Sequence, residues 1–145
     1  MGASDAEAWA EMRAALWPGE KRDGLRSGAL AMLASNEAWA FLAETQAGEP
    51  VGFAEVEVRK YANGCESMPV PFLEAIFVQP RFRRRGVGRA LIGHIRGFLV
   101  ARGFRELGSD ALIDNHVSHG AHRGWGFSET ERVVYVRQSL VDEAR

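Results

Sequence analysis

The stretch FLEAIFVQPRFRRRGVGRALI (residues 72–92) is the most informative part of the sequence for the fold. Its first seven residues, 72–78, are an apolar run rich in residues that favour β-structure, so we expect a central strand there. Residues 87–101 carry large apolar side chains at helical spacing, and Gly103 follows where a helix-ending glycine is expected. A turn rich in arginine and glycine separates the two segments, so the sequence predicts a strand, a basic turn and a helix.

The remaining segments extend this pattern on both sides. We predict helices up to Trp17 and over 25–34, an antiparallel hairpin from 38–44 and 51–58, strands at 104–110 and 129–140, and a short helix at 116–123. Helices and strands alternate along the second half of the chain. This order predicts an α/β layered domain, and we expect one domain over residues 1–145.

Charge and cysteine content exclude several classes of protein. The chain has 145 residues with 18 basic and 19 acidic side chains, a net charge of −1, which gives no overall field for nucleic acid or an anionic membrane. The single cysteine, Cys65, excludes an internal disulfide and a multi-cysteine zinc site. We see neither an apolar run of membrane-spanning length nor a signal-peptide pattern, so we expect a cytoplasmic protein.

The basic turn has three possible interpretations: a solvated surface turn, a nucleic-acid patch, or a cradle for a phosphorylated small molecule. The first N–H groups of a helix lack intrahelical partners, and the helix dipole favours an anion there. Glycines let the backbone approach a ligand closely, and guanidinium groups bind phosphate oxygens as a fork. The turn lacks the wider basic stripe of a nucleic-acid module, so we favour the cradle.

The residues of this turn also carry a family resemblance. Residues 83–88 (RRRGVG) match the pattern [QR]-x-x-G-x-[GA], and here the chain resembles the GCN5-related N-acetyltransferases (GNAT). The segment 124–127 (GWGF) resembles a later element of the same family. The resemblance implies an α/β GNAT fold, with a mixed central β-sheet flanked by helices on both faces, and acetyl-CoA as co-substrate. The implied coenzyme-binding residues are Phe77, Val78, Arg83, Arg84, Arg85, Gly86, Val87, Gly88, Arg89 and Asn115, although helix capping is an equally simple role for Asn115.

Further segments resemble one subgroup, the aminoglycoside 6′-N-acetyltransferases. They are LWPGE (16–20), YANGCES (61–67), SD (109–110) and GFSETERVVYVR (126–137). This resemblance implies acetylation of the 6′-amine of aminoglycoside antibiotics, and hence antibiotic resistance. It also implies a small polycationic acceptor and a homodimer.

The chemistry of acetyl transfer asks for few groups. The attacking amine must lose a proton, and the tetrahedral oxyanion needs a preorganised donor. For the proton we favour the carboxylate of Glu74, which lies inside an apolar run, with Asp110 as the second candidate. The alternatives are a strand-edge glutamate that faces water or an internal arginine, and an ordinary turn or helix-capping aspartate. The family places the thioester beside strand 72–78, which makes the N–H near Val78 the oxyanion candidate. Many family members have a tyrosine as the acid that protonates the thiolate; His122 occupies that position here, although a solvated histidine explains it as well.

The acceptor side is expected to be acidic and partly aromatic. Besides Glu74 and Asp110, the candidates for substrate binding are Trp17, Glu55, Tyr61 and Glu131. Packing at the end of the first helix explains Trp17 equally well, and a solvated strand face explains Glu55 and Glu131. The three histidines of HVSHGAH (116–122) lack a carboxylate or cysteine at metal-site spacing, so we predict no metal.

Cys65 lies in a loop without an activating neighbour in the sequence, so we expect direct transfer in a ternary complex rather than a covalent enzyme intermediate. Two alternatives stay open: an acetyltransferase for another amine, such as a polyamine or a protein N-terminus, and a non-catalytic acetyl-CoA sensor.

Overall fold

The computed structural model describes residues 3–141, and its elements follow the predicted α/β pattern. The elements in chain order are helices α1 (Ala3–Leu16) and α2 (Arg22–Ala34), strands β1 (Ala38–Glu44), β2 (Pro50–Arg59) and β3 (Val70–Val78), a short 3-10 helix η1 (Pro80–Phe82), and helices α3 (Val87–Ala101) and α4 (His116–Gly124). The named strands form one antiparallel sheet in the order β1-β2-β3. The predicted hairpin and the predicted helix at 87–101 are confirmed.

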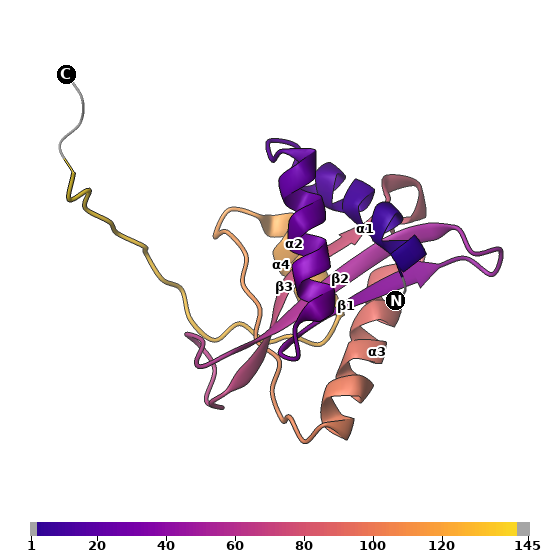
Figure 1. Cartoon of the computed structure of the whole chain (residues 1–145). Helices are drawn as coiled ribbons and strands as arrows, with labels where there is room; N and C mark the ends of the chain where they lie inside the picture. The colour runs from indigo at the N-terminus through magenta and orange to yellow at the C-terminus, as the bar shows by residue number, and fades with distance from the viewer. Residues whose placement is uncertain (1–2, 142–145) are drawn as a thin grey trace.

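Helices cover both faces of this sheet, as predicted (Figure 1). On one face, α1 and α2 bury a cluster that consists of Trp9, Met12, Ala29, Phe53, Ala75 and Phe77. On the other face, α3 buries a cluster that consists of Ala54, Val56, Leu73, Leu91, Ile92, Ile95 and Leu99. The apolar spacing of α3 is therefore the stripe that packs on the sheet.

A β-bulge interrupts the pairing of β2 with β3. Glu55 pairs with Ala75 and Val56 with Leu73, so Glu74 is the extra residue between them. An extra residue reverses which side of the strand each later N–H group faces. Leu73 N donates to Gly108 O on the outer edge of β3, whereas Gln79 N donates to Val51 O of β2. Glu74 thus lies at the point where the N–H groups of odd-numbered residues change from the outer edge of β3 to the side that faces β2.

Two predicted strands differ from the sequence-based expectation. Of segment 104–110, only Gly108 takes part in pairing, through one parallel bridge to Phe72, and β3 is the last strand of the named sheet rather than a central one. Residues 129–140 form no strand, and the far end of this segment runs away from the body (Figure 1). A strand forms only where its backbone bonds a neighbouring edge, and this segment pairs with no described strand.

Candidate active site

The basic turn forms an open cradle at the N-terminus of α3. Gly86 is the N-cap residue, with a φ of +82° in the left-handed region that glycine adopts without strain. Its carbonyl accepts from Ala90 N at 2.9 Å, so α3 begins here and its first N–H groups face outward. A Cβ placed on Gly86 would meet no heavy atom within 4 Å, which leaves room for a ligand against the backbone.

The arginines of the turn lie around this helix start. Arg83 donates from Nε to the carbonyl of Val78 at 2.8 Å, which ties the turn to the end of β3. Arg84, Arg85 and Arg89 are exposed, and Arg84 has a positive φ of 62°. Exposed guanidinium groups beside outward N–H groups and a helix dipole fit the diphosphate of a coenzyme.

Gly88, the second glycine of the turn, has a packing role. A Cβ on Gly88 would lie 2.9 Å from Cζ2 of Trp125, so the absence of a side chain lets Trp125 pack against the first turn of α3. The two glycines of the motif therefore have different roles. Gly86 adopts the left-handed backbone conformation at the start of α3, and Gly88 allows the segment after α4 to approach closely.

The end of β3 presents the predicted oxyanion donor. Because Gln79 N bonds to β2 and donors alternate along an antiparallel pair, the N–H of Val78 points to the outer edge of β3. The bridge from Phe72 to Gly108 lies at the other end of the strand. Phe77, its neighbour, packs into the core cluster of α1 and α2 instead of facing this edge. Val78 N–H is thus open to an oxygen that approaches this edge.

The middle of β3 carries an ion pair that the sequence did not indicate. Both carboxylate oxygens of Glu74 accept from Arg59, with Nε···Oε1 at 2.8 Å and Nη2···Oε2 at 2.7 Å. The guanidinium lies 3.6 Å from the ring centroid of Phe72. The hydrogen bonds that Arg59 donates to Glu74, and the charges of Glu74 and Asp110, raise the pKa of Arg59. Glu74 is therefore part of a bidentate pair with an arginine, one of the alternatives that the sequence left open for it.

A cleft of about 270 Å³ opens beside this pair. Its lining includes two residues predicted for the acceptor side, Tyr61 and Asp110. Arg59 also lines it, and Glu74 lies next to the cleft as the partner of Arg59. Asn63, Ser109 and Tyr135, which were not predicted as site residues, complete the polar lining.

His122 is held in place by two serines. Its Nδ1 lies 2.7 Å from the carbonyl oxygen of Ser118, which can only accept, so this nitrogen carries the proton of the neutral ring. Its Nε2 lies 2.7 Å from Oγ of Ser109, which then donates to it. His122 thus reaches the cleft only through Ser109, a connection that a count along the sequence does not reveal.

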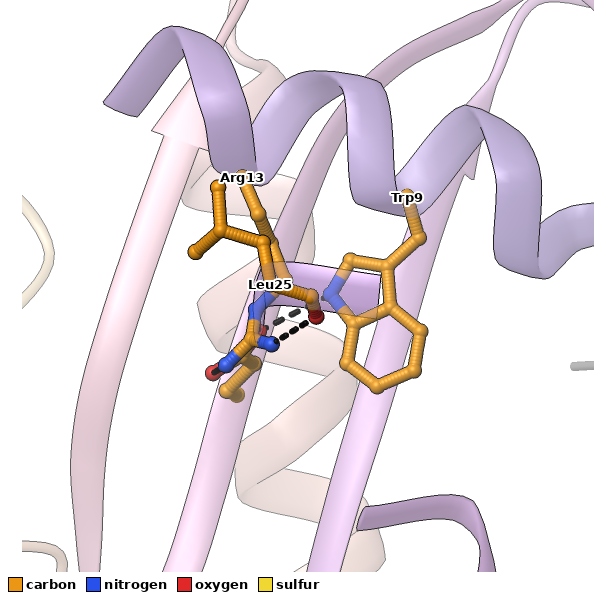
Figure 2. A network of polar contacts seen from close by, with 4 residues as sticks. Trp9, Arg13 and Leu25 are labelled. Carbon is orange, nitrogen blue, oxygen red and sulfur yellow. Dashed lines mark hydrogen bonds and ion pairs between the residues drawn. The ribbon is translucent and has the colours of Figure 1, made fainter. Parts of the chain in front are cut away.

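Glu55 and Trp17 belong to a network beneath α1. Glu55 is 2 % exposed; its Oε1 accepts from the indole Nε1 of Trp9 at 2.9 Å and lies 2.7 Å from Nε of Arg13, in an ion pair whose geometry falls short of a hydrogen bond. Arg13 also donates to the carbonyl of Leu25 at 2.7 Å (Figure 2). Its guanidinium lies 5.1 Å from the ring centroid of Trp17. Burial raises the pKa of Glu55, while Arg13 and Trp9 oppose the shift. These contacts give Glu55 a role in holding α1 and α2 on the sheet.

The other predicted residues lie apart from the cleft. Asn115 caps α4 by accepting from Ser118 N at 3.1 Å, which is the simpler of its two predicted roles. Glu131 is exposed on the extended C-terminal segment.

Within residues 3–141 no group of three or more histidine, cysteine or acidic side chains gathers as a metal site. No described helix is long and apolar enough to cross a membrane.

An exposed basic turn that suits a phosphate follows one end of β3, and a polar cleft that contains Arg59 and Asp110 lies towards the other end. This arrangement is compatible with group transfer. The sequence model of the acetyltransferase (GNAT) family matches residues 7–127, most of the chain. The protein belongs to this GNAT acetyltransferase family, and the predicted fold is confirmed.

Individual relatives cover nearly the whole chain. An aminoglycoside N(6′)-acetyltransferase type 1 of Stenotrophomonas maltophilia is 47 % identical over 142 residues, 97 % of this chain and 92 % of the relative. A solved structure of AAC(6′)-Iy with the bisubstrate analogue CoA-S-monomethyl-acetylneamine superposes with a TM-score of 0.90 at 38 % identity, covering 96 % of this chain and 95 % of that one. A structure of AAC(6′)-Iy with CoA gives a TM-score of 0.89 at 39 % identity, with coverages of 95 % and 91 %.

Proposed function

We propose that the protein is an acetyl-CoA-dependent aminoglycoside 6′-N-acetyltransferase that confers antibiotic resistance. The observation that carries the proposal is the arrangement along β3: an anion cradle at Gly86 follows its end, and the carboxylate of Glu74 stands in its middle. The near-complete match to aminoglycoside N(6′)-acetyltransferase relatives supports the acceptor class.

The cradle is proposed to hold the coenzyme. Arg84, Arg85 and Arg89 bind the diphosphate oxygens, together with the backbone at Gly86 and the N-terminus of α3. Bound acetyl-CoA supplies the activated acetyl group as a thioester. The N–H of Val78, on the outer edge of β3, donates to the carbonyl oxygen as negative charge develops on it.

Proton transfer is proposed to involve Glu74 and, on the opposite side of the reaction, His122. Glu74 takes or relays the proton of the attacking amine after one of its oxygens is released by Arg59, and Asp110 is the alternative base. For the departing sulfur, the imidazolium form of His122 donates its Nε2 proton to Oγ of Ser109 while the hydroxyl proton of Ser109 passes to the thiolate, which leaves His122 neutral.

Direct transfer in a ternary complex is favoured over a covalent enzyme intermediate. Burial raises the pKa of the Cys65 thiol, and the charge of Glu106 raises it further, so the thiol stays protonated at neutral pH. A protonated thiol is a poor nucleophile. The described contacts of Cys65 are with the small core cluster of Ala62, Val70 and Phe72, which is a packing role.

A homodimer in the cytoplasm is the proposed state of the enzyme. Support comes from the extended C-terminal segment, where Val134, Val136 and Leu140 are 88 %, 90 % and 90 % exposed. Exposed apolar residues in an extended segment favour burial against another surface, and a second copy of the same chain can supply that surface. Light scattering should give the mass of two chains, and Val134→Glu with Val136→Glu should give one; a monomeric parent protein would contradict the proposal.

An acetyl-CoA turnover assay across acceptor classes tests the proposed function. Thiol release is measured with aminoglycosides, linear polyamines and peptides with free N-termini. Aminoglycosides should give the highest kcat/KM. Preference for a polyamine or peptide would favour the rival amine acetyltransferase, and coenzyme binding without thiol release would favour a sensor.

A further inference from the structure

Arg59 places a positive charge beside the proposed binding site of a polycationic acceptor, where no positive charge would be expected. It extends from the end of β2 with both Nε and Nη2 on Glu74, at 2.8 and 2.7 Å, and its face against Phe72. The pair is accessible, with side-chain exposures of 39 % for Arg59 and 23 % for Glu74. A molecule in the cleft contacts Arg59 directly, and the exposed part of Glu74 lies beside it.

The charges around Arg59 identify it as the shared counter-ion of the acidic residues. The negative charges of Glu74, Asp110 and Glu57 all favour its charged form. Asp110 lines the same cleft as Arg59, so a second carboxylate is near the guanidinium. An acceptor ammonium that binds Glu74 competes with Arg59 for the same two oxygens, because a carboxylate in a fork–fork pair has both oxygens engaged.

We propose that Arg59 is a specificity-determining residue that occupies Glu74 as an internal cation and is displaced by acceptors with two or more ammonium groups. This rests on the proposed function. One ammonium takes an oxygen of Glu74 while another approaches the cleft from the side of Tyr61 and Tyr135, and the charge of Asp110 receives the displaced guanidinium. A monoamine only replaces the guanidinium of Arg59 on Glu74 by its own ammonium and has no second ammonium to make a further contact, so it binds weakly. Arg59 also orients Glu74, which keeps the carboxylate aimed along the cleft until the acceptor binds.

The test compares acceptors that differ in charge number across variants of Arg59. KM and kcat are measured for a 6′-amino aminoglycoside and for 6-amino-6-deoxyglucose, which has one amine. Arg59→Gln should lower KM for both acceptors by about 2- to 5-fold, the size expected for removing a partly exposed ion pair, and more for the monoamine. It should lower kcat as well, because Glu74 loses its orientation. Arg59→Lys keeps the charge without the fork, so kcat should fall and KM should stay near the wild-type value.

A role of Arg59 in folding alone would not produce this pattern. Arg26→Gln, which removes an equally charged residue from the exposed pair with Glu7, is the control and should change neither parameter. The acceptor Kd, measured by calorimetry with CoA bound, separates binding from turnover. If Arg59→Gln fails to fold, Arg59→Met, which retains the apolar stem over Phe72, is measured in its place.

The outcomes separate this inference from the proposed function. A wild-type enzyme that acetylates no aminoglycoside overturns the function, and with it the present role of Arg59. A wild-type enzyme that does so, with KM unchanged or raised in the folded Gln or Met variant, overturns the role of Arg59 alone. An unaltered preference between the two acceptors also overturns it.

Discussion

The indole N–H of Trp9 donates to Oε1 of Glu55 across 2.9 Å, inside the core between α1 and β2. Arg13, one helical turn further along α1, pairs with the same carboxylate. Burying a carboxylate is costly unless its partners remain, and removing one partner of a buried pair leaves an uncompensated charge. The stability of the helical layer therefore depends on Arg13 more than on the charge of Glu55.

Arg13→Met should destabilise the fold by about 3–5 kcal/mol, because it strands the carboxylate of Glu55. Glu55→Gln should cost less, about 1–2 kcal/mol, since an amide oxygen still accepts from Trp9, and Arg13 keeps the carbonyl of Leu25 and the faces of the two tryptophan rings as partners. Urea unfolding measures both, with Arg26→Met on the exposed face as control. Equal losses in the two variants would contradict the account.

The effect of Arg13→Met should grow with pH. Burial raises the pKa of Glu55 above its ordinary value of 4.5 in the folded protein. Such a group stabilises the fold fully below the unfolded pKa and loses that contribution as pH rises through the folded pKa. Without Arg13 the folded pKa rises further, so the stability difference from wild type should widen from about pH 4 to neutral pH. A difference that narrows over this range would be inconsistent with the network.

Gly86→Val should weaken acetyl-CoA binding by about tenfold or more, because a β-branched residue resists a φ of +82° and its side chain fills the space beside the helix start. Gly93→Val is the matched control: Gly93 is exposed within α3, and a Cβ there meets nothing within 4 Å. Calorimetry with acetyl-CoA on both folded variants gives the comparison, and equal affinities would remove the cradle from the proposed site.

Cys65→Ala should retain nearly all of kcat, because the raised pKa of this thiol keeps it protonated and direct transfer does not use it. A modest loss of stability is expected from the small cluster around Phe72. Steady-state kinetics with the alanine variant measures this. A loss of about a hundredfold in kcat, or an acetylated Cys65 in mass spectra, would instead indicate a covalent intermediate.

Glu74→Gln should lower kcat by about 10²- to 10⁴-fold, the usual cost of losing a general base, with acetyl-CoA affinity nearly unchanged. Raising the pH should recover part of the loss, since more of the substrate amine is then neutral. If Glu74 supplies only charge for the acceptor, KM rises while kcat holds. Full kcat at neutral pH would transfer the role of base to Asp110 or a water chain.

The parts of the fold that depend on local pattern were predictable. The strand at 72–78, the helix at 87–101 and the hairpin before them follow from periodicity and turn residues, and the structure confirms each one. The exposed basic turn at the start of α3 was predictable for the same reason, because it lies within one continuous stretch of sequence that ends a strand and begins a helix.

The contacts of the site were less predictable, because they join distant segments. Arg59 reaches Glu74 only because β2 and β3 pair, and the bulge at Glu74 depends on the register of that pairing. The alternation of Glu55 and Glu57 predicts a solvated strand face, which is wrong for Glu55, because α1 brings Trp9 over it and buries it. Residues 129–140 have the composition of a strand, and no sequence pattern states where the strand finds its neighbour.

The position of the acetyl group on the product tests the central claim most directly. Purified enzyme is incubated with acetyl-CoA and a 6′-amino aminoglycoside, and separately with its counterpart that has a 6′-hydroxyl, and the products are mapped by mass spectrometry and NMR. The first acceptor should gain one acetyl group on the 6′ nitrogen, and the second should react poorly because a hydroxyl is a much weaker nucleophile. Acetylation at another ring, or equal turnover of both acceptors, would contradict the account.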